Sequence, residues 1–288
     1  SDSEQKVGAA FSAMRGKIVL ATKTAAQNAD EFWKDLETSL RTLKTDYIDI
    51  YQFHNPAVCP KPGDGSGLYE AMLEAKEQGK IRFIGITNHR MSIAEEAIES
   101  GLYDTLQFPF NYLSTEREIA LAKACAEHEM GFIAMKGLSG GLLTNSAAIY
   151  AYMAQFENVL PIWGVQKESE LDEFLSYIGN PPELTDELKA VIEKDQKELA
   201  GEFCRGCGYC MPCPAGIEIN NCARMSLLLR RSPSAGHLSP EGQAKMKKIE
   251  DCLHCGHCKS MCPYGLDTPK LLEENYKDYK EVLAGKRL

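Results

Sequence analysis

The chain has 288 residues, a length that suits two domains, and 44% of its residues are apolar, as in globular proteins with a large core. Its formal net charge of −9 excludes non-specific nucleic-acid binding, which depends on a basic surface. No apolar run approaches the roughly 18–20 residues that a membrane span needs, and no secretory signal opens the sequence. We therefore expect a cytoplasmic protein without a nucleic-acid or membrane partner.

Strand patterns alternate with helix patterns over the first 175 residues or so. Apolar residues recur every three or four positions over Asp30–Leu43, the period of a helix. Ser92 is a candidate N-cap for the helix that follows it. The expected elements, in chain order, are strand Ile18–Thr22, helix Asp30–Leu43, strand Tyr47–Phe53, helix Gly67–Glu77, strand Ile81–Ile86, helix Ile93–Glu99, strand Thr105–Phe110, helix Thr115–His128, strand Phe132–Met135, strand Val159–Trp163 and helix Ser169–Tyr177.

These repeated βα units predict a parallel sheet with helical crossovers. An open doubly wound sheet and a closed (β/α)8 barrel share this pattern, but no Gly-rich dinucleotide fingerprint follows a strand, which disfavours the open sheet. A closed barrel needs eight units, and we count about six. Asn180-Pro181-Pro182 breaks the chain before the expected helix Glu183–Leu199, so we expect a partial barrel over residues 1–180 and a second domain over 181–288.

The cysteines are concentrated in the second domain. Nine of the eleven lie between residues 204 and 262, a distribution that indicates a metal-rich segment in a reducing compartment and not a disulfide scaffold. They form two motifs, each ending in Cys-Pro. The first motif consists of Cys204, Cys207, Cys210 and Cys213, and the second of Cys252, Cys255, Cys258 and Cys262.

Thiolates at this spacing suit iron–sulfur clusters, with zinc as the simpler alternative. Zinc needs only a pair of Cys-x2-Cys elements and does not explain two complete motifs. In two-cluster ferredoxins the Cys of the Cys-Pro pair ligates the other cluster. We therefore expect two 4Fe–4S clusters, one held by Cys204, Cys207, Cys210 and Cys262 and the other by Cys252, Cys255, Cys258 and Cys213.

Three further residues of this segment are expected to have no ligand role. Cys222 lies in a helix-like run over Asn220–Arg231 and is read as a buried structural thiol, and His254 and His257 are read as loop residues. Some 38 residues separate the motifs, too many for a compact β-rich ferredoxin. Helix patterns at Met225–Leu229 and Ala244–Ile249 make the domain similar to the α-helical ferredoxins.

Residues 1–175 resemble the aldo-keto reductase family, and the cysteine tail resembles that of a subgroup with a C-terminal dicluster domain. The resemblance implies a (β/α)8 barrel and NADP(H)-dependent hydride transfer to or from a carbonyl or alcohol substrate. The segments that carry it are Asp2-Ser3-Glu4, Ala21-Thr22-Lys23-Thr24, Ile84-Gly85-Ile86-Thr87-Asn88 and the run from Asp35 to His54, Asp35-Leu36-Glu37-Thr38-Ser39-Leu40-Arg41-Thr42-Leu43-Lys44-Thr45-Asp46-Tyr47-Ile48-Asp49-Ile50-Tyr51-Gln52-Phe53-His54.

The resemblance implies catalytic roles for Lys23, which tunes a proton-donating Tyr, and for His54, which orients the carbonyl. Lys23 is expected to end the first strand and His54 the second. The family's Tyr and its Asp partner would precede Ser1, so we expect this chain to be part of a longer protein.

Cofactor contacts are implied in the same way. Thr87, Asn88 and Gln107 match positions that hold the nicotinamide carboxamide, and Met135 stands where many members stack an aromatic ring. Gly164 and Lys167 match the loop that holds the adenosine phosphate, where a cation favours NADP. The residues alone leave plainer roles open: a turn former for Asn88, a core amide for Gln107 and a surface charge for Lys167.

The sequence leaves the purpose of the clusters open among three roles: exchange of electrons with a redox partner protein, oxygen sensing, and stabilisation of a small domain. The main prediction is an NADP-dependent reductase with an appended dicluster domain. The alternative is an iron–sulfur electron-transfer or binding protein whose barrel lacks carbonyl reductase activity.

Overall fold

The computed structural model describes residues 2–199 and 203–287. They form two compact units. The first comprises Ser1–Pro109, Ser114–Met135 and Phe156–Pro161, and the second comprises Phe110–Leu113, Lys136–Gln155 and Ile162–Leu288. None of the helices in the described ranges is long and apolar enough to cross a membrane.

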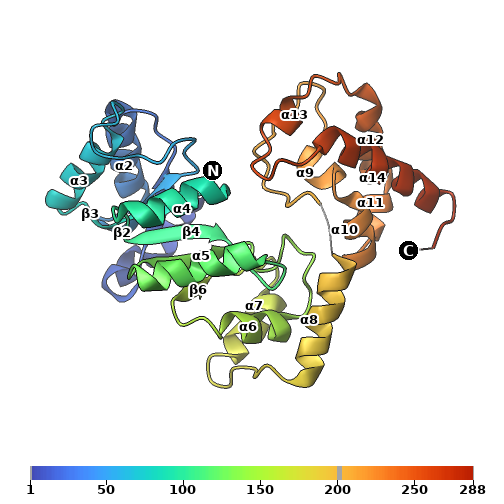
Figure 1. The fold of residues 1–288 in the computed structure, drawn as a ribbon, viewed down its shortest axis with the longest axis horizontal. Coiled ribbons are helices and arrows are strands. Elements are labelled where there is room, and N and C mark those ends of the chain that lie inside the picture. The colour runs from blue at the N-terminus through green and yellow to red at the C-terminus, as the bar shows by residue number, and fades with distance from the viewer. Residues whose placement is uncertain (1, 200–202, 288) are drawn as a thin grey trace. The chain divides into compact units, whose positions relative to one another are not determined.

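The first unit is built on a six-stranded sheet whose strands are all parallel and follow one another in chain order (Figure 1). This confirms the predicted run of six βα units. The strands are β1 (Ala21–Thr24), β2 (Ile48–His54), β3 (Ile81–Thr87), β4 (Thr105–Pro109), β5 (Gly131–Met135) and β6 (Val159–Pro161).

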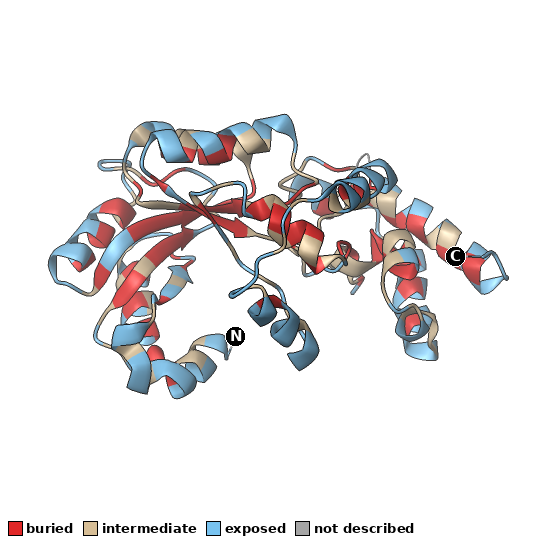
Figure 2. Ribbon diagram, turned by 90° about the horizontal axis from the view of Figure 1, so that it is seen from below, coloured by how far each residue is buried: buried red, intermediate tan, exposed pale blue. Residues whose placement is uncertain are grey.

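Side chains alternate between the two faces of this sheet. On the outer face, Tyr51, Ile84 and Leu106 are buried under helices, and Figure 2 shows the strands as a largely buried layer. We call the opposite face the inner face. Two of its apolar side chains, Phe83 and Leu160, are 49% and 64% exposed. The inner face is therefore incompletely covered in the part of the chain described.

Two helices of the first unit begin at residues whose side chains cap them. The Asn28 side chain accepts a hydrogen bond from Glu31 N at the start of α2, and Thr115 forms a capping box with Glu118 at the start of α5. These contacts explain why both helices start close to the predicted positions. The helical elements are α1 (Ser3–Phe11), η1 (Ser12–Lys17), α2 (Ala29–Leu43), α3 (Leu68–Glu77), α4 (Met91–Ser100) and α5 (Glu116–Glu127).

Several predicted boundaries differ from the structure, and two of these differences have a clear cause. The first strand is Ala21–Thr24 and not Ile18–Thr22, because side chains of Arg15 and Asp49 bind the backbone at Ile18 and Leu20. Lys23 therefore lies within β1. Ser92 lies inside α4 and is not its cap. The Asn88 side chain accepts hydrogen bonds from the backbone N–H of the next two residues, and this turn starts the helix earlier.

The second unit is entirely helical among its described residues (Figure 1). The predicted run Asn220–Arg231 is divided in two, because Ala223 and Arg224 are not helical. The helical elements are α6 (Ser146–Met153), α7 (Glu168–Ser176), α8 (Asp186–Glu198), α9 (Ile219–Cys222), α10 (Met225–Arg231), α11 (Ala235–Leu238), α12 (Pro240–Lys247), η2 (Lys248–Asp251), α13 (His257–Ser260) and α14 (Thr268–Leu283).

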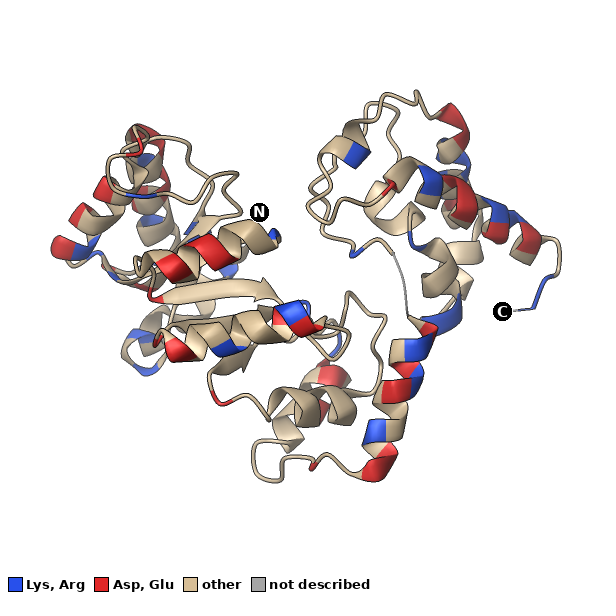
Figure 3. Ribbon diagram, in the orientation of Figure 1, with Lys and Arg blue, Asp and Glu red and all other residues tan. Residues whose placement is uncertain are grey.

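A buried carboxylate connects α8 to its surroundings in this unit. Asp195 accepts a hydrogen bond from the Tyr112 hydroxyl and pairs with Arg231 of α10. Acidic and basic residues follow one another along α8 (Figure 3). Arg231 also pairs with Glu198, one turn further along α8, so a single guanidinium joins two carboxylates of that helix.

Candidate functional site

The inner face of the sheet brings together residues that were predicted separately. His54 of β2 is in register with Thr87 of β3, which is in register with Gln107 of β4. Lys23 of β1 is in register with Gln52, two residues before His54 on the same face. Because all strands are parallel, these positions lie toward one edge of the sheet, the edge formed by the carboxyl ends of the strands.

Lys23 and His54 influence each other electrostatically. Burial lowers the pKa of Lys23, and the charge of Glu4 opposes that change. Burial also lowers the pKa of His54, and the positive charge of Lys23 lowers it further. At neutral pH the imidazole is therefore mainly neutral and can donate one hydrogen bond and accept another. A neutral donor beside a cation can orient and polarise a carbonyl oxygen.

Gln107 is held in place by two side-chain contacts. Its Oε1 atom accepts a hydrogen bond from Gln52 Nε2 at 3.2 Å, and its Nε2 atom lies 3.5 Å from Met135 Sδ. Gln52 is buried, and its own Oε1 atom has no hydrogen-bond partner among the described residues. The Gln107 amide therefore has a fixed orientation in the middle of β4, next to the thioether of Met135.

Asn88 follows β3 and is fully buried. Its Nδ2 atom donates to Pro56 O at 2.9 Å, and its Oδ1 atom accepts the N–H groups of His89 and Arg90. Its backbone N–H donates to Gln107 O at 3.1 Å. In this conformation the Asn88 side chain builds the turn after β3, which is the plainer role considered above.

Gly164 and Lys167 lie in the second unit, before α7. Both are exposed, and Lys167 is the N-cap residue of this helix. The Glu170 carboxylate accepts the backbone N–H groups of Gln166 and Lys167 at 2.8 and 3.3 Å. A carboxylate therefore already uses donors that a phosphate at this helix terminus would need.

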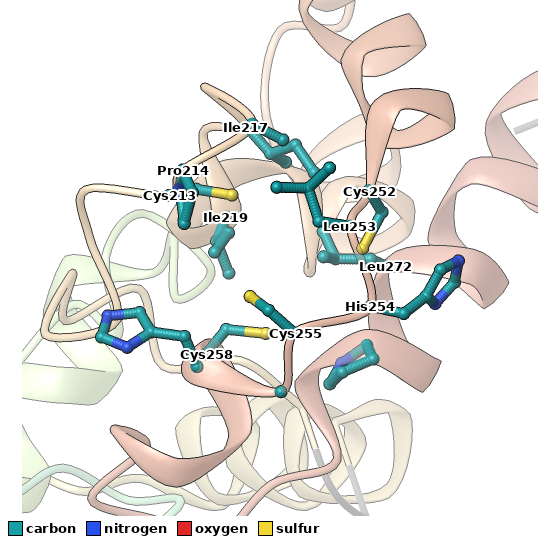
Figure 4. A pocket seen from close by; sticks show the side chains of 14 residues that line it. Cys213, Pro214, Ile217, Ile219, Cys252, Leu253, His254, Cys255, Cys258 and Leu272 are labelled. Carbon is teal, nitrogen blue, oxygen red and sulfur yellow. The ribbon is translucent and has the colours of Figure 1, made fainter.

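The second unit contains a pocket lined by four of the predicted ligands, Cys213, Cys252, Cys255 and Cys258. Figure 4 shows their sulfur atoms directed toward one common space, with the labelled His254 ring turned away from it. We call this the second cluster site. Cys213 comes from the first motif, so one cysteine of that motif lines the pocket together with three of the second. The remaining lining is mostly apolar, including Ile217, Ile219, Leu253 and Leu272.

We call Cys204, Cys207, Cys210 and Cys262 the first cluster site. Burial raises the pKa of Cys204, and the charges of Cys207 and Cys262 act in the same direction. The Gly206 N–H and the positive charge of Arg224 lower it. Burial likewise raises the pKa of Cys210 to about 12.

The donor set of both sites fits iron–sulfur clusters. Four thiol groups per site supply one sulfur for each iron of a 4Fe–4S cube, and the lining of the second site is mostly apolar. Among the described residues, no group of three or more His, Cys, Asp or Glu side chains is arranged to hold a single metal ion. Cys222 is buried outside both sites, with its Sγ atom 3.9 Å from Lys245 O, as expected of a structural thiol.

Three residues near these sites were missed by the sequence analysis. Gln52 shares the inner face with His54, and strand alternation alone could have indicated it. Arg224 is a buried arginine whose guanidinium lies against the loop of the first motif. No local sequence signal distinguishes it from the exposed Arg230 of α10. Lys136, which follows β5, is also half-buried, and burial and the Arg224 charge lower its pKa, while Cys207 and Cys204 oppose this.

Comparison with family models identifies both parts of the chain. Residues 1–157 match the aldo/keto reductase family, and residues 203–267 match the 4Fe-4S dicluster domain. Both expectations drawn from the resemblance, the barrel family and the dicluster tail, are thereby confirmed.

Curated relatives match about half of the chain. The chain is 30% identical over 154 residues to aldo-keto reductase YhdN of Bacillus subtilis, which covers 49% of this chain and 46% of that protein. It is 32% identical over 162 residues to methylglyoxal reductase DkgB of Salmonella typhimurium, a match that covers 51% of this chain and 59% of that protein. The chain thus spans about half the length of the curated relatives it matches.

Solved structures show the same fold. Aldo-keto reductase AKR11C1 of Bacillus halodurans, in its holo form, superposes with a TM-score of 0.58 at 23% identity, covering 69% of this chain and 79% of that one. An aldo/keto reductase of Klebsiella pneumoniae in complex with NADP and acetate superposes with a TM-score of 0.54 at 24% identity. The match covers 67% of this chain and 75% of that one. The predicted fold class was a parallel α/β barrel followed by a helical dicluster region. This fold class is confirmed.

Proposed function

We propose, from the premise that this chain belongs to the aldo/keto reductase family, that it forms part of an NADP-dependent carbonyl reductase carrying two 4Fe–4S clusters. The observation that carries the proposal is the row of His54, Thr87 and Gln107 on the inner face, with Lys23 beside it. Chemistry at the carboxyl ends of parallel strands is what a (β/α)8 barrel supports.

The reaction assigned to this edge is reduction of an aldehyde or ketone to an alcohol, and its reverse. NADPH, when bound, supplies the hydride for the carbonyl carbon. His54 donates a hydrogen bond to the carbonyl oxygen and holds the carbonyl in place. Lys23 would stabilise the phenolate form of a proton-donating Tyr, which lowers the pKa of that Tyr and favours proton donation to the oxygen.

Gln107 is proposed to hold the nicotinamide carboxamide, and Met135 to pack on the ring. Support for Gln107 is its fixed orientation on β4, between Gln52 and Met135. Thr87 lies beside it in the same row. Asn88 is proposed to support the cofactor site through the turn that it builds. Lys167 is proposed to attract the adenosine phosphate of NADP through its positive charge.

The two clusters are proposed to exchange electrons with a redox partner protein. Hydride transfer moves two electrons together, whereas each cluster passes one, so the clusters serve a separate electron route and not the hydride step itself. Support comes from the second cluster site, where Cys255 is exposed and Leu253 beside it is 66% exposed. A cluster near the surface can exchange electrons with a docked protein.

The test uses the full-length, cluster-loaded protein and follows NADPH binding and aldehyde-dependent NADPH oxidation, with methylglyoxal as the first probe because a relative is named for it. We expect binding, and a loss of about 100-fold or more in kcat/KM for His54→Ala and Lys23→Met. Lys34→Met, an exposed lysine on α2, is the matched control and should retain full activity. Absence of NADPH binding would favour the alternative, an iron–sulfur electron-transfer or binding protein.

A further inference from the structure

We propose that the guanidinium of Arg224 is the fixed counter-charge of the first cluster site and makes that cluster the more easily reduced of the two. The inference rests on the proposed presence of clusters. It assigns to Arg224 a positioning role, exerted through the charge it places beside the thiolates of the first motif.

Arg224 is held rigidly, although it lies outside any regular helix. It is 8% exposed and is the residue before α10. Its Nε atom donates to Asn220 O at 3.1 Å, and its Nη1 atom donates to Ser139 O at 3.5 Å. Both acceptors are uncharged carbonyl oxygens. They fix the direction of the side chain without neutralising its charge.

Two glycines allow this side chain to approach the cysteine loop. A Cβ atom at Gly206 would lie 2.8 Å from Arg224 Cζ, and one at Gly140 would lie 2.6 Å from Arg224 Nη1. Gly206 stands between Cys204 and Cys207, and its N–H donates to Cys204 Sγ at 3.4 Å. The guanidinium therefore lies against the backbone that wraps the first cluster site.

No carboxylate balances this charge within the described ranges. Arg224 takes part in none of the ion pairs found there, whereas Arg230 pairs with Asp278, and Arg231 with Asp195 and Glu198. A buried, unpaired guanidinium is costly unless an anion lies nearby. A 4Fe–4S core of charge +2 bound by four thiolates carries a net charge of −2, which supplies that anion.

The second cluster site lacks a comparable cation. Neither Lys nor Arg is among the described residues that line its pocket, which is largely apolar. Reduction adds one negative charge to a cluster, so a fixed cation beside it stabilises the reduced form and raises the reduction potential. An electron entering at the exposed second site would thus move on to the first.

The experiment compares Arg224→Gln and Arg224→Lys in the full-length protein, purified anaerobically, by redox titration followed by electron paramagnetic resonance. Cys213→Ser and Cys262→Ser identify which signal belongs to which cluster. We expect Arg224→Gln to make reduction of the first cluster at least tenfold less favourable, a fall in potential of about 59 mV for one electron. Arg224→Lys, which keeps the positive charge, should restore most of the lost reduction potential.

Arg230→Gln is the control, because it removes a charge of the same kind from the same domain but from an exposed ion pair. It should change neither potential. The inference would be overturned if the reduction potential of the first cluster were unchanged in cluster-loaded Arg224→Gln. It would also be overturned if the reduction potentials of both clusters shifted equally. If Arg224→Gln loses its first cluster, Arg224→Lys decides: retention of the cluster supports the inference, and equal loss shows a purely structural arginine. Absence of iron and sulfide from the wild type would instead refute the proposed function.

Discussion

The side chain of Gln52 reaches across Gly85 to donate a hydrogen bond to Gln107, with 3.2 Å between Nε2 and Oε1. The two glutamines belong to β2 and β4, so β3 must have no side chain at the crossing point. A Cβ atom at Gly85 would lie 2.6 Å from Gln52 Cγ and 2.5 Å from Thr105 Oγ1. The proposed nicotinamide contact therefore depends on a glycine two strand positions before Thr87.

Gly85→Ala should destabilise the first unit and displace Gln52. Overpacking at a buried position with no room to relax costs roughly 1–3 kcal/mol. We expect a lower urea midpoint and weaker NADPH binding than in the wild type. Gly131→Ala is the matched control, because the added Cβ would meet Thr105 Cγ2 at an ordinary 3.5 Å. A wild-type midpoint for Gly85→Ala would contradict the crossing.

Lys23→Met should raise the pKa of His54. The Lys23 charge and burial both lower that pKa, so removal of the charge leaves burial alone, and the pKa should rise yet stay below the ordinary value of about 6.5. NMR titration of the imidazole carbons measures the change directly. Lys34→Met should leave the pKa unaltered. An unaltered value in Lys23→Met would show that the two side chains are not neighbours.

Asp195→Asn should destabilise the second unit far more than Glu198→Gln. Asp195 is buried between the Tyr112 hydroxyl and Arg231, and removal of its charge leaves Arg231 with one partner, at a cost of roughly 3 kcal/mol. Glu198 is half exposed, so its pair with Arg231 should contribute less than about 1 kcal/mol. Urea denaturation of both variants compares them, and equal effects would contradict this assignment.

Cys213→Ser should remove the second cluster alone. Its sulfur is directed into the space shared with Cys252, Cys255 and Cys258, so iron should fall by about half while the first cluster's signal persists. Cys222→Ala, which removes a buried thiol outside both sites, should keep the full iron content. Loss of the first cluster in Cys213→Ser would refute crosswise ligation.

Hydrophobic periodicity was sufficient to predict the six βα units and most of the helix positions. It failed at β1 and at α4, where side chains of Arg15, Asp49 and Asn88 bind the backbone and move the boundaries. The Asp49 contact depends on tertiary structure, and none of the three contacts leaves a periodic signal. The division of the chain into domains at residue 180 stays a prediction.

The cysteine spacing predicted which sulfur atoms meet at the second cluster site, including Cys213 from the other motif. It could not predict Arg224, whose burial depends on two glycines, Gly140 and Gly206, that are distant in sequence from it. Gln52 could have been predicted from the sequence, since it lies two residues before His54 and therefore on the same face of β2. Roles of the individual site residues stay predictions until variants are measured.

Iron and acid-labile sulfide, measured on the anaerobically purified protein, test the central claim most directly. Two 4Fe–4S clusters on the eight assigned cysteines predict about eight iron and about eight sulfide per chain. Zinc without sulfide, bound to the same cysteines, would contradict the account.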